Sequence, residues 1–340
     1  MPLSFSYLSN LVRNNPLLAS VSLLSILFLL RRQHRPNKRQ TKIPLNEEHV
    51  LILGASSGVG RTLAVQYVQR GAYVCIVARN KEGLEGTRRE CLGVSESMSN
   101  LKGEGEAEKR VVAVVADFSD AEGMAKVRER IQAEWGRLDT LAVIAGVSSL
   151  RPLLETTGIE CKEGRGSSFP DADVEGVRTG QQIASAAIQG NFTGPLTAVL
   201  TCIAFLERTS PSPSVLLLSS VAAVTPAPTR TLYCASKSAA LILYQSLAIE
   251  HPKVHFTSIL PGTIEGAFRA SAVDGGLVRE SDPNRSGLKR EVVARRCIQA
   301  VDRQERDVFM QGFYRFAPVL YYSLCPGLIE WVASKKYKYT

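Results

Sequence analysis

The sequence lacks the residue patterns with which proteins bind metals. Its seven cysteines are scattered, and no two of them form a C-x-x-C pair. Its four histidines show no ligand spacing either. We therefore predict no metal site. Several cysteines lie inside apolar runs, where cysteine acts as a small hydrophobic residue, and this usage fits a reducing compartment.

Acidic residues are absent from the first 42 positions, which hold seven Lys or Arg. The other 298 residues carry 34 basic and 32 acidic side chains, so the net charge of +9 is a local property of the N-terminus. A nucleic-acid-binding domain normally carries its positive charge on one face of the folded body. The sequence therefore predicts no nucleic-acid partner.

Charge is also absent between Arg13 and Arg31, where the strongly apolar part runs from Pro16 to Leu30. At about 1.5 Å per residue this stretch is a marginal span of the ~30 Å hydrocarbon core of a bilayer. The cations that follow should stay in the cytosol. We expect residues 1–45 to form a single-pass membrane anchor with a basic juxtamembrane segment. A cleaved signal peptide and a helix lying on the membrane surface are the alternatives.

Short apolar runs alternate with helical patterns from residue 49 onward. The predicted strands are 49–54, 73–78, 111–116, 140–145, 214–219, 254–260 and 307–310. The predicted helices are 60–70, 81–92, 121–135, 179–208 and 231–250. Continuous apolar strands separated by helices indicate a parallel sheet covered on both faces. We predict a single doubly wound Rossmann-type α/β domain of about seven strands over residues 46–312.

Three segments depart from this alternation. Residues 95–110 are polar and rich in Gly and Glu, which predicts a solvated loop. Residues 156–180 are also loop-like, and they either line a substrate entrance or have no role in the site. Residues 313–340 are apolar and aromatic, then basic, which predicts a membrane-associated helical tail. Core packing or dimerisation is the alternative for this tail.

A glycine-rich turn, "GASSGVG", connects the first predicted strand to the first predicted helix. It contains Gly54, Ser56, Ser57, Gly58 and Gly60. Glycines allow a tight turn and close approach of the backbone to a pyrophosphate, and the helix N-terminus offers free N–H groups. The turn therefore predicts a dinucleotide site; the alternative is a glycine-rich turn with no ligand.

The end of the second predicted strand, "VARN", indicates which dinucleotide binds. An acidic residue at this position favours NAD, whereas Arg79 can grip the 2′-phosphate of NADP. We therefore predict NADP(H), with an ordinary surface cation as the alternative reading of Arg79. Asp117, after the third strand, either accepts a hydrogen bond from the adenine amine or caps the following helix.

Tyr233 and Lys237 are four residues apart in a predicted helix and so share one face. Ser220 lies thirteen residues before the tyrosine, and "NFTG" begins at Asn191. With the glycine turn, these motifs resemble the short-chain dehydrogenase/reductase family over roughly residues 47–310. The resemblance implies that Tyr233 is the general acid/base and that Lys237 lowers its pKa and binds the nicotinamide ribose. It implies that Ser220 polarises the substrate carbonyl and that Asn191 carries a proton relay through water.

The resemblance also implies further cofactor contacts. "LPGTIEG" resembles the family's Pro-Gly loop beside the nicotinamide, with Pro261, Gly262 and Thr263 as the contact residues. "VIAG" lacks the family's paired Asn and keeps only Ala145 and Gly146. Since those Asn are mainly structural, we expect altered local bonding rather than lost catalysis.

The anchor and the tail together resemble the membrane-bound branch that contains 11-beta-hydroxysteroid dehydrogenase-like enzymes and lipid-ketone reductases. This implies an NADPH-dependent, reversible reductase of a hydrophobic carbonyl or alcohol, such as a ketosteroid, 3-ketosphingoid base, acyl-dihydroxyacetone phosphate or retinoid. We expect it in the endoplasmic reticulum, with lipid droplets as the alternative, in contact with membrane lipid; whether it is a homodimer is open. The competing function is a non-catalytic dinucleotide-binding regulatory or scaffold protein.

Overall fold

The computed structural model describes residues 39–98, 106–160, 169–279 and 282–339. The predicted membrane span at 16–30 lies outside the described residues. Within them, no helix combines the length and the apolar character that crossing a bilayer requires.

Seven parallel strands form one sheet in the order β3-β2-β1-β4-β5-β6-β7. They are β1 (His49–Leu53), β2 (Tyr73–Ala78), β3 (Val111–Val115), β4 (Thr140–Val143), β5 (Ser214–Leu218), β6 (His255–Leu260) and β7 (Asp307–Phe309). The doubly wound sheet predicted from the apolar runs is therefore confirmed, with each strand ending within two residues of its predicted end. The strand order reverses on either side of β1, which places a crevice at the carboxyl ends of β1 and β4.

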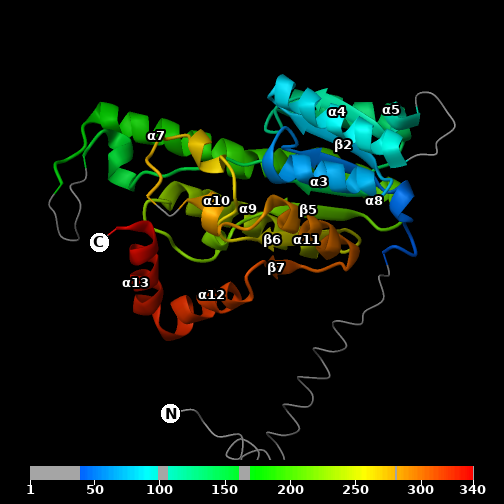
Figure 1. Cartoon of the computed structure of the whole chain (residues 1–340). Helices are drawn as coiled ribbons and strands as arrows, with labels where there is room; N and C mark the ends of the chain where they lie inside the picture. The colour runs from blue at the N-terminus through cyan, green and yellow to red at the C-terminus, as the bar shows by residue number, and fades with distance from the viewer. Residues whose placement is uncertain (1–38, 99–105, 161–168, 280–281, 340) are drawn as a thin grey trace, which may run out of the picture.

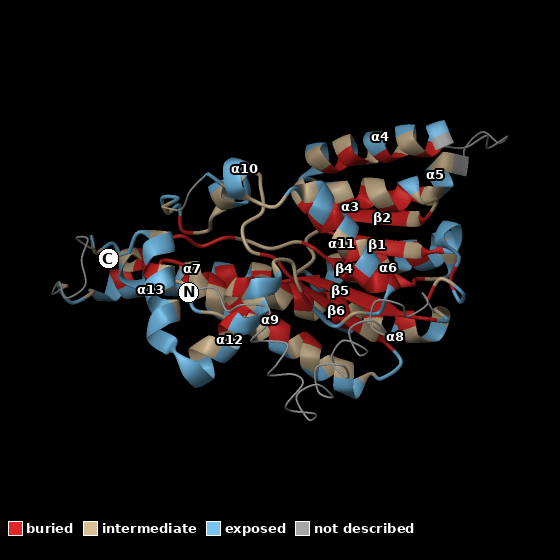
Figure 2. Cartoon of the chain, turned by 60° about the horizontal axis from the view of Figure 1, so that its bottom comes forward, coloured by how far each residue is buried: buried red, intermediate tan, exposed pale blue. Residues whose placement is uncertain are grey.

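Alternate residues of each strand enter two separate hydrophobic cores, because successive side chains point to opposite faces of a sheet. On β1, Val50 and Ile52 face one core, and Leu51 and Leu53 face the other. The first core is covered by α3 (Gly58–Gln69), α4 (Lys81–Met98) and α11 (Arg290–Asp302). The second is covered by α6 (Ala121–Trp135), α8 (Gly194–Thr209) and α9 (Thr231–Glu250). Figures 1 and 2 show these two helical layers and the buried strands between them.

The predicted helix at 179–208 contains an irregularity at its centre. It consists of α7 (Val174–Ile188), one π-helical turn η3 (Gln189–Thr193) and α8. A π-turn inside an α-helix is rare and often marks a functional position. Here it carries Asn191 and turns the "NFTG" motif toward the end of the sheet.

Two of the predicted loops are partly helical, which corrects the sequence analysis. α4 continues to Met98, and α5 (Glu106–Arg110) precedes β3, so only the centre of the 95–110 segment lies outside the described residues. α7 begins at Val174 because the carboxylate of Asp173 accepts a hydrogen bond from Gly176 N and caps the helix. Ahead of it, η2 (Leu153–Thr157) is a short 3-10 helix.

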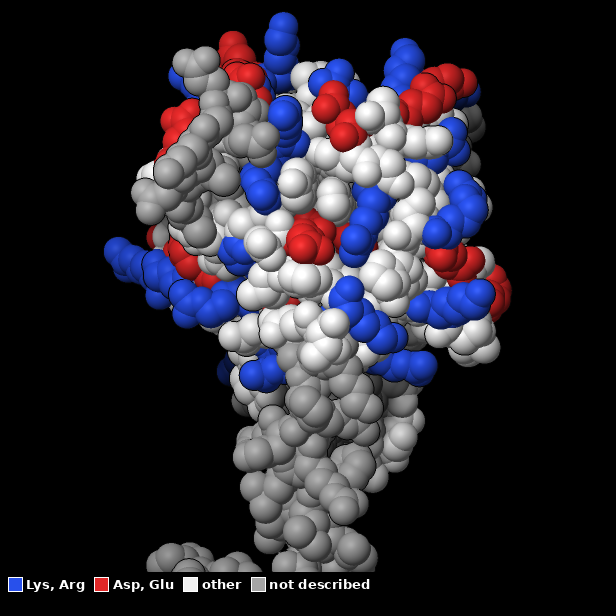
Figure 3. Space-filling view, turned by 90° about the vertical axis from the view of Figure 1, so that its right-hand side faces the viewer, with Lys and Arg blue, Asp and Glu red and all other residues white. Residues whose placement is uncertain are grey.

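The C-terminal tail is helical and folds beside the carboxyl ends of the strands (Figure 1), whereas its expected association with a membrane stays a prediction. It contains η6 (Gly312–Phe316), α12 (Ala317–Val319), η7 (Leu320–Leu324) and α13 (Pro326–Tyr337). At the opposite, amino edge of the sheet the chain enters through η1 (Leu45–Glu47), with Arg39 and Ile43 buried against the body. Figure 3 shows that Lys/Arg and Asp/Glu are interspersed on the side of the molecule that faces right in Figure 1.

Candidate active site

A large cavity of about 1640 Å³ opens at the carboxyl ends of the strands. Loops that follow β1 to β6 line it, and the C-terminal tail forms one wall. Every site residue predicted from the sequence lines this cavity except Asn191, which lies directly behind it. The fold therefore brings together residues that are more than 200 positions apart in the chain.

The glycine turn forms a cradle with free backbone donors. Gly54 and Gly58 have φ of +93° and +55°, which favours glycine, and a Cβ on Gly58 would meet nothing within 4 Å. A Cβ on Gly60 would lie 2.1 Å from the carbonyl oxygen of Gly54, so this position requires glycine for packing. Ser57 precedes α3 without capping it through its side chain, so the first N–H groups of α3 face the cavity. Together with Ser56, which lines the same cavity, this geometry fits a pyrophosphate.

Arg79 and Asp117 lie side by side at the ends of β2 and β3. Arg79 Nη1 is 3.5 Å from Asp117 Oδ2, and the arginine side chain is 70% exposed. The backbone and the hydroxyl of Ser119 donate to Asp117, and these bonds together with Arg79 outweigh burial and lower the pKa of its carboxyl. The helix-capping role considered for Asp117 is wrong, because Asp120 caps α6 by accepting from Gly123 N.

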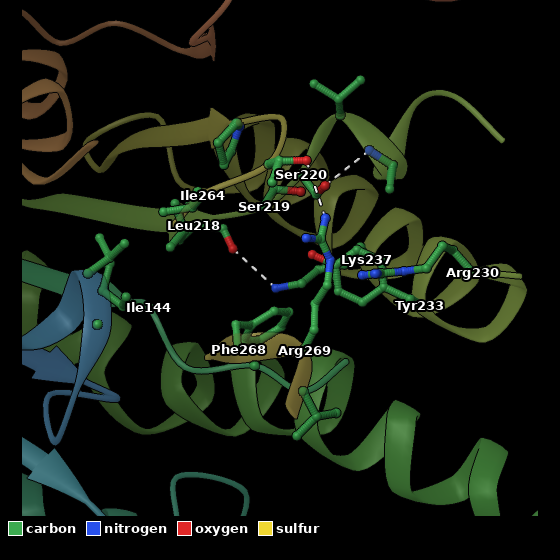
Figure 4. Close-up of a pocket in the computed structure, with 18 of the residues that line it drawn as sticks. Ile144, Leu218, Ser219, Ser220, Arg230, Tyr233, Lys237, Ile264, Phe268 and Arg269 are labelled. Carbon is green, nitrogen blue, oxygen red and sulfur yellow. Dashed lines mark hydrogen bonds between the residues drawn. The ribbon is translucent and has the colours of Figure 1, made fainter. Parts of the chain in front are cut away.

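Tyr233 and Lys237 lie on one face of α9, as the i,i+4 spacing predicts, and both are buried. Lys237 Nζ donates to the carbonyl oxygen of Leu218 at 3.1 Å (Figure 4). Ser220 begins a 3-10 turn (Val221–Ala223), and its hydroxyl accepts from Ala222 N and hydrogen-bonds the tyrosine. The three side chains therefore lie together in the cavity (Figure 4).

Burial sets the protonation behaviour of this group. It raises the pKa of Tyr233 above its usual value, although the Arg230 guanidinium and the hydrogen bond with Ser220 act in the other direction. Burial also lowers the pKa of Lys237 to about 8. The lowering of the tyrosine pKa that was expected from Lys237 is therefore not observed, since the ammonium points to a carbonyl and the nearest effective cation is Arg230.

Asn191 connects three parts of the site. Its side-chain amide donates to the Val147 carbonyl oxygen and to Ser236 Oγ, and its Oδ1 accepts from Val147 N. A Cβ on Gly146 would lie 2.9 Å from Asn191 Oδ1 and 3.0 Å from Lys237 Nζ. Gly146 is therefore required by the close approach of the β4 loop to these two side chains.

The other predicted cofactor residues also line the cavity. Ala145 follows β4, and its backbone N–H donates to Leu53 O, which keeps this loop against the glycine turn. After β6, the Pro261 carbonyl accepts from Val221 N, and Gly262 N donates to the Gln311 side chain. Thr263 Oγ1 accepts from the Arg269 guanidinium.

Sequence reasoning missed four contributors to the cavity. Arg230 lies one turn before Tyr233, with its guanidinium 4.5 Å from the tyrosine ring centroid. Phe268 packs edge-on against the same ring at 6.2 Å, and Arg269 follows it. The tail contributes apolar side chains, including Tyr314. The signal available for Arg230 was its i−3 spacing from the tyrosine; the other residues meet the site only through tertiary folding.

A glycine cradle at a helix N-terminus, combined with a buried tyrosine and lysine and a half-buried serine at the carboxyl ends of the same strands, defines a dinucleotide-binding α/β oxidoreductase. Comparison with known proteins agrees: the family profile "short chain dehydrogenase" matches residues 48–275. The chain belongs to the short-chain dehydrogenase family, and is an oxidoreductase.

The relatives and solved structures extend this assignment. The chain is 29% identical over 294 residues to "11-beta-hydroxysteroid dehydrogenase A" of Sesamum indicum, covering 83% of this chain and 73% of the relative. It is 31% identical over 244 residues to "11-beta-hydroxysteroid dehydrogenase-like 4A" of Arabidopsis thaliana, covering 71% and 68%. A short chain dehydrogenase from Burkholderia cenocepacia, solved in complex with NADP, shares the fold with a TM-score of 0.61 at 20% identity, over 85% of this chain and 98% of that one.

Proposed function

We propose that this protein is an NADPH-dependent reductase of a hydrophobic carbonyl compound, acting reversibly on the corresponding alcohol. The observation that carries the proposal is that one cavity is lined by Tyr233, Ser220 and Lys237, by the glycine turn and by apolar side chains of the C-terminal tail. The names of the plant relatives, 11-beta-hydroxysteroid dehydrogenases, support a hydrophobic substrate. Ketosteroids, 3-ketosphingoid bases, acyl-dihydroxyacetone phosphates and retinoids are the candidate classes.

The residues of the site have separate tasks in this reaction. The glycine turn would hold the pyrophosphate of a reduced nicotinamide cofactor, which would supply the hydride. Ser220 donates a hydrogen bond to the substrate oxygen, and Tyr233 transfers its phenolic proton to that oxygen as negative charge develops. Because burial keeps the pKa of Tyr233 high, the phenol is protonated at neutral pH and ready for reduction. Lys237 would bind the nicotinamide ribose, and a proton relay through Asn191 and water would return a proton to the phenolate that remains.

The proposed cofactor is NADP(H) rather than NAD(H). Arg79 stands at the end of β2, largely exposed and facing the cavity, where it can form two hydrogen bonds with a 2′-phosphate. The acidic residue that would repel this phosphate is not at the strand end, which is occupied by Ala78. Asp117 pairs with Arg79 across 3.5 Å, and the 2′-phosphate would compete with this carboxylate for the guanidinium.

We also propose that the protein works at a membrane of the endoplasmic reticulum or of a lipid droplet. Support comes from the apolar stretch at 16–30 and from the tail, where large apolar side chains lie on the surface beside basic residues. The exposed ones are Phe313, Phe316, Val319, Tyr322, Leu324, Leu328, Trp331, Val332 and Tyr339. Carbonate extraction of membranes from cells that express the full chain, beside a chain lacking residues 1–38, tests the anchor; release of the full chain would refute it.

NADPH oxidation by the detergent-solubilised full chain, followed at the nicotinamide absorbance against the four carbonyl classes, tests the catalytic proposal. Tyr233→Phe removes only the phenolic oxygen, and we expect turnover to fall by roughly 10²- to 10⁴-fold with NADPH binding retained. Turnover that survives this change would refute the role of Tyr233. NADPH binding without turnover on any carbonyl would favour the alternative, a dinucleotide-binding scaffold.

A further inference from the structure

Two chain segments that line the cavity are joined to each other. The β4 segment, residues 144–158, follows β4, and the β6 segment, residues 261–279, follows β6. Residues 144–147 of the first and 261–269 of the second line the cavity, and so does Val273. The contacts that join the two segments therefore set the width of this part of the cavity.

The backbones of the two segments form the first contact. Ser148 and Ala272 make an isolated parallel β-bridge, in which Val273 N donates to Ser148 O at 2.9 Å. Ser148 directly follows Val147, and the side chain of Asn191 holds Val147 through two hydrogen bonds. A series of contacts therefore runs from the π-turn η3, through the β4 segment, to the β6 segment.

Asp274, next to the bridge, joins the segments through its carboxylate. It is 6% exposed, and its Oδ2 accepts from Ser149 Oγ and Leu150 N, both at 2.7 Å, and from Arg151 N at 2.9 Å. Its Oδ1 accepts from Gly276 N at 3.1 Å. Burial alone would raise the pKa of this carboxyl, but the hydrogen bonds outweigh it and hold the pKa below its usual value. Asp274 is therefore ionised at neutral pH, and hydrogen bonds to an ionised acceptor are the strong ones.

Two further contacts extend the junction along both segments. A Cβ on Gly276 would lie 2.8 Å from Leu150 Cβ and 2.9 Å from Arg151 N, so the two backbones pack closely here. Beyond it, Arg279 Nη2 lies 3.0 Å from Glu155 Oε1, and both side chains are partly buried. The β6 segment is therefore fastened to the β4 segment on both sides of Gly276.

The β6 segment also carries a side chain that stands beside the reacting tyrosine (Figure 4). Its 3-10 helix η5 (Phe268–Ser271) places the ring of Phe268 edge-on to that of Tyr233, with the ring centroids 6.2 Å apart. The bridge at Ala272 directly follows η5. Because Phe268, Val273 and Tyr233 line one cavity, a substrate that reaches the tyrosine lies against this wall.

We propose that Asp274 is a positioning residue for the substrate: it fastens the β6 segment to the β4 segment and so holds Phe268 and Val273 against a bound hydrophobic carbonyl compound. This inference rests on the proposed function and adds a residue to it. Asp274 does not itself line the cavity, so it acts through its segment. The wall contacts the substrate before and during the reaction alike, so its loss should raise KM more than it lowers kcat.

Hydrogen exchange of the full chain in detergent, measured by mass spectrometry, tests the junction without a substrate. In Asp274→Ala, peptides that contain residues 148–151 and 272–276 should exchange roughly tenfold faster than in the wild type, because their amides lose their acceptor. Peptides of β5 should keep the wild-type rate. Asp282→Ala is the matched control, because Asp282 accepts from Asn284 N and caps the short helix α10 (Pro283–Ser286) that follows the segment. Exchange in Asp274→Ala that equals that of the control overturns the inference.

Steady-state kinetics on the carbonyl class that the wild type reduces fastest separates positioning from folding. Asp274→Ala should raise KM by roughly tenfold and lower kcat by less than about twofold, with the Kd for NADPH unchanged. A role in stability alone would lower the fraction of folded enzyme, so kcat would fall at constant KM; that result overturns the inference. Asp274→Asn keeps one acceptor oxygen and should raise KM by roughly threefold, and it carries the test if Asp274→Ala does not fold.

Quenching of bound NADPH by acrylamide gives a readout that needs no turnover. Acrylamide is small and neutral and quenches on contact, so its quenching constant reports access to the nicotinamide ring. We expect this constant to rise by roughly twofold or more in Asp274→Ala and to stay unchanged in Asp282→Ala. A wild type that binds NADPH, with unchanged quenching and KM in the variants, loses this inference and keeps the proposed function. A wild type that binds no NADPH loses the proposed function, and this inference falls with it.

Discussion

Lys237 is a residue whose function opposes the stability of the fold. It is 4% exposed, and burial lowers its pKa to about 8, compared with ~10.4 for an unfolded lysine. Below pH 8 both states are protonated, and the folded state carries the full cost of a buried charge. Between these two pKa values the lysine binds more protons in the unfolded chain than in the folded one, so its contribution to the free energy of unfolding rises with pH.

Lys237→Met should therefore stabilise the protein at pH 7 while it abolishes turnover. Removal of the buried charge should raise the free energy of unfolding by roughly 3 kcal/mol, as the difference in pKa indicates. Loss of the hydrogen bond to the Leu218 carbonyl should lower it by about 1 kcal/mol. We therefore expect a net increase of about 2 kcal/mol in the free energy of unfolding, measured with urea. Between pH 8 and pH 10 the wild type should gain stability relative to the variant, because only the wild type carries this lysine. A variant less stable than the wild type at pH 7 would contradict this account.

Arg79 should decide the choice between the two cofactors. Arg79→Gln keeps a polar side chain but removes the charge that would meet a 2′-phosphate, so the Kd for NADPH should rise about tenfold. The Kd for NADH, which has no such phosphate, should stay the same. Fluorescence titration measures both constants. Arg89→Gln, an exposed position on α4, is the control; equal losses for the two cofactors would assign Arg79 a merely structural role.

The sequence predicted the members of the site better than their contacts. Tyr233 and Lys237 are held together by helical spacing, and the glycine turn by local backbone geometry, so short motifs were sufficient. Arg230 was missed although it is close in sequence, because its role depends on the direction in which its side chain leaves the helix. Arg269 lies in the short 3-10 helix η5 (Phe268–Ser271), in a segment without sequence periodicity, so only the folded chain places it beside the tyrosine.

Among the secondary-structure elements, apolar runs identified strands more reliably than polar segments identified loops. The strands are buried on both faces, so their sequences are continuously apolar. The start of α7 at Val174 and the end of α4 at Met98 were missed because exposed helices depend on capping and local hydrogen bonds rather than on burial. The π-turn at Gln189–Thr193 has no signal in the sequence beyond Gly190 within it and Gly194 directly after it.

The cap at Asp173 should account for part of the stability of α7. Asp173→Ala removes the carboxylate that accepts from Gly176 N at 2.7 Å, which should cost about 1 kcal/mol in the free energy of unfolding. Asp120→Ala removes the equivalent cap of α6 and is the matched comparison. Urea denaturation of both variants measures the effect. If Asp173→Ala unfolds with the wild-type midpoint, α7 is held by its packing against η2 and not by the cap.

At the scale of the whole molecule, the two ends of the parallel strands carry different features. The cavity lies at the carboxyl ends of the strands, and a buried network of charges lies at their amino ends. Glu48 is fully buried there, where it accepts from Arg39 Nη1 and Thr140 Oγ1, both at 2.6 Å, and pairs with Arg70. Arg70 also pairs with Asp302 at the end of α11. The network ties the segment that leads in from the N-terminus to three separate elements of the body.

Breaking this network from its N-terminal side should destabilise the whole fold. Burial alone would raise the pKa of Glu48, but Arg39 and Arg70 outweigh it and keep the pKa below its usual value. The two arginines therefore stabilise the fold at any pH above ~4.3, the pKa of this carboxyl in the unfolded chain. This stabilisation is lost as the pH falls through the lower pKa of Glu48 in the folded state. Arg39→Met leaves the buried carboxylate of Glu48 with one cation fewer. The free energy of unfolding, measured with urea at pH 7, should therefore fall by about 3 kcal/mol, and acid unfolding should begin at a higher pH. Arg61→Met, which breaks the exposed pair with Glu90, is the control and should cost less than about 1 kcal/mol. Equal effects of the two substitutions would mean that Arg39 contributes no more than a surface ion pair, and that the body is stable without the segment that carries it.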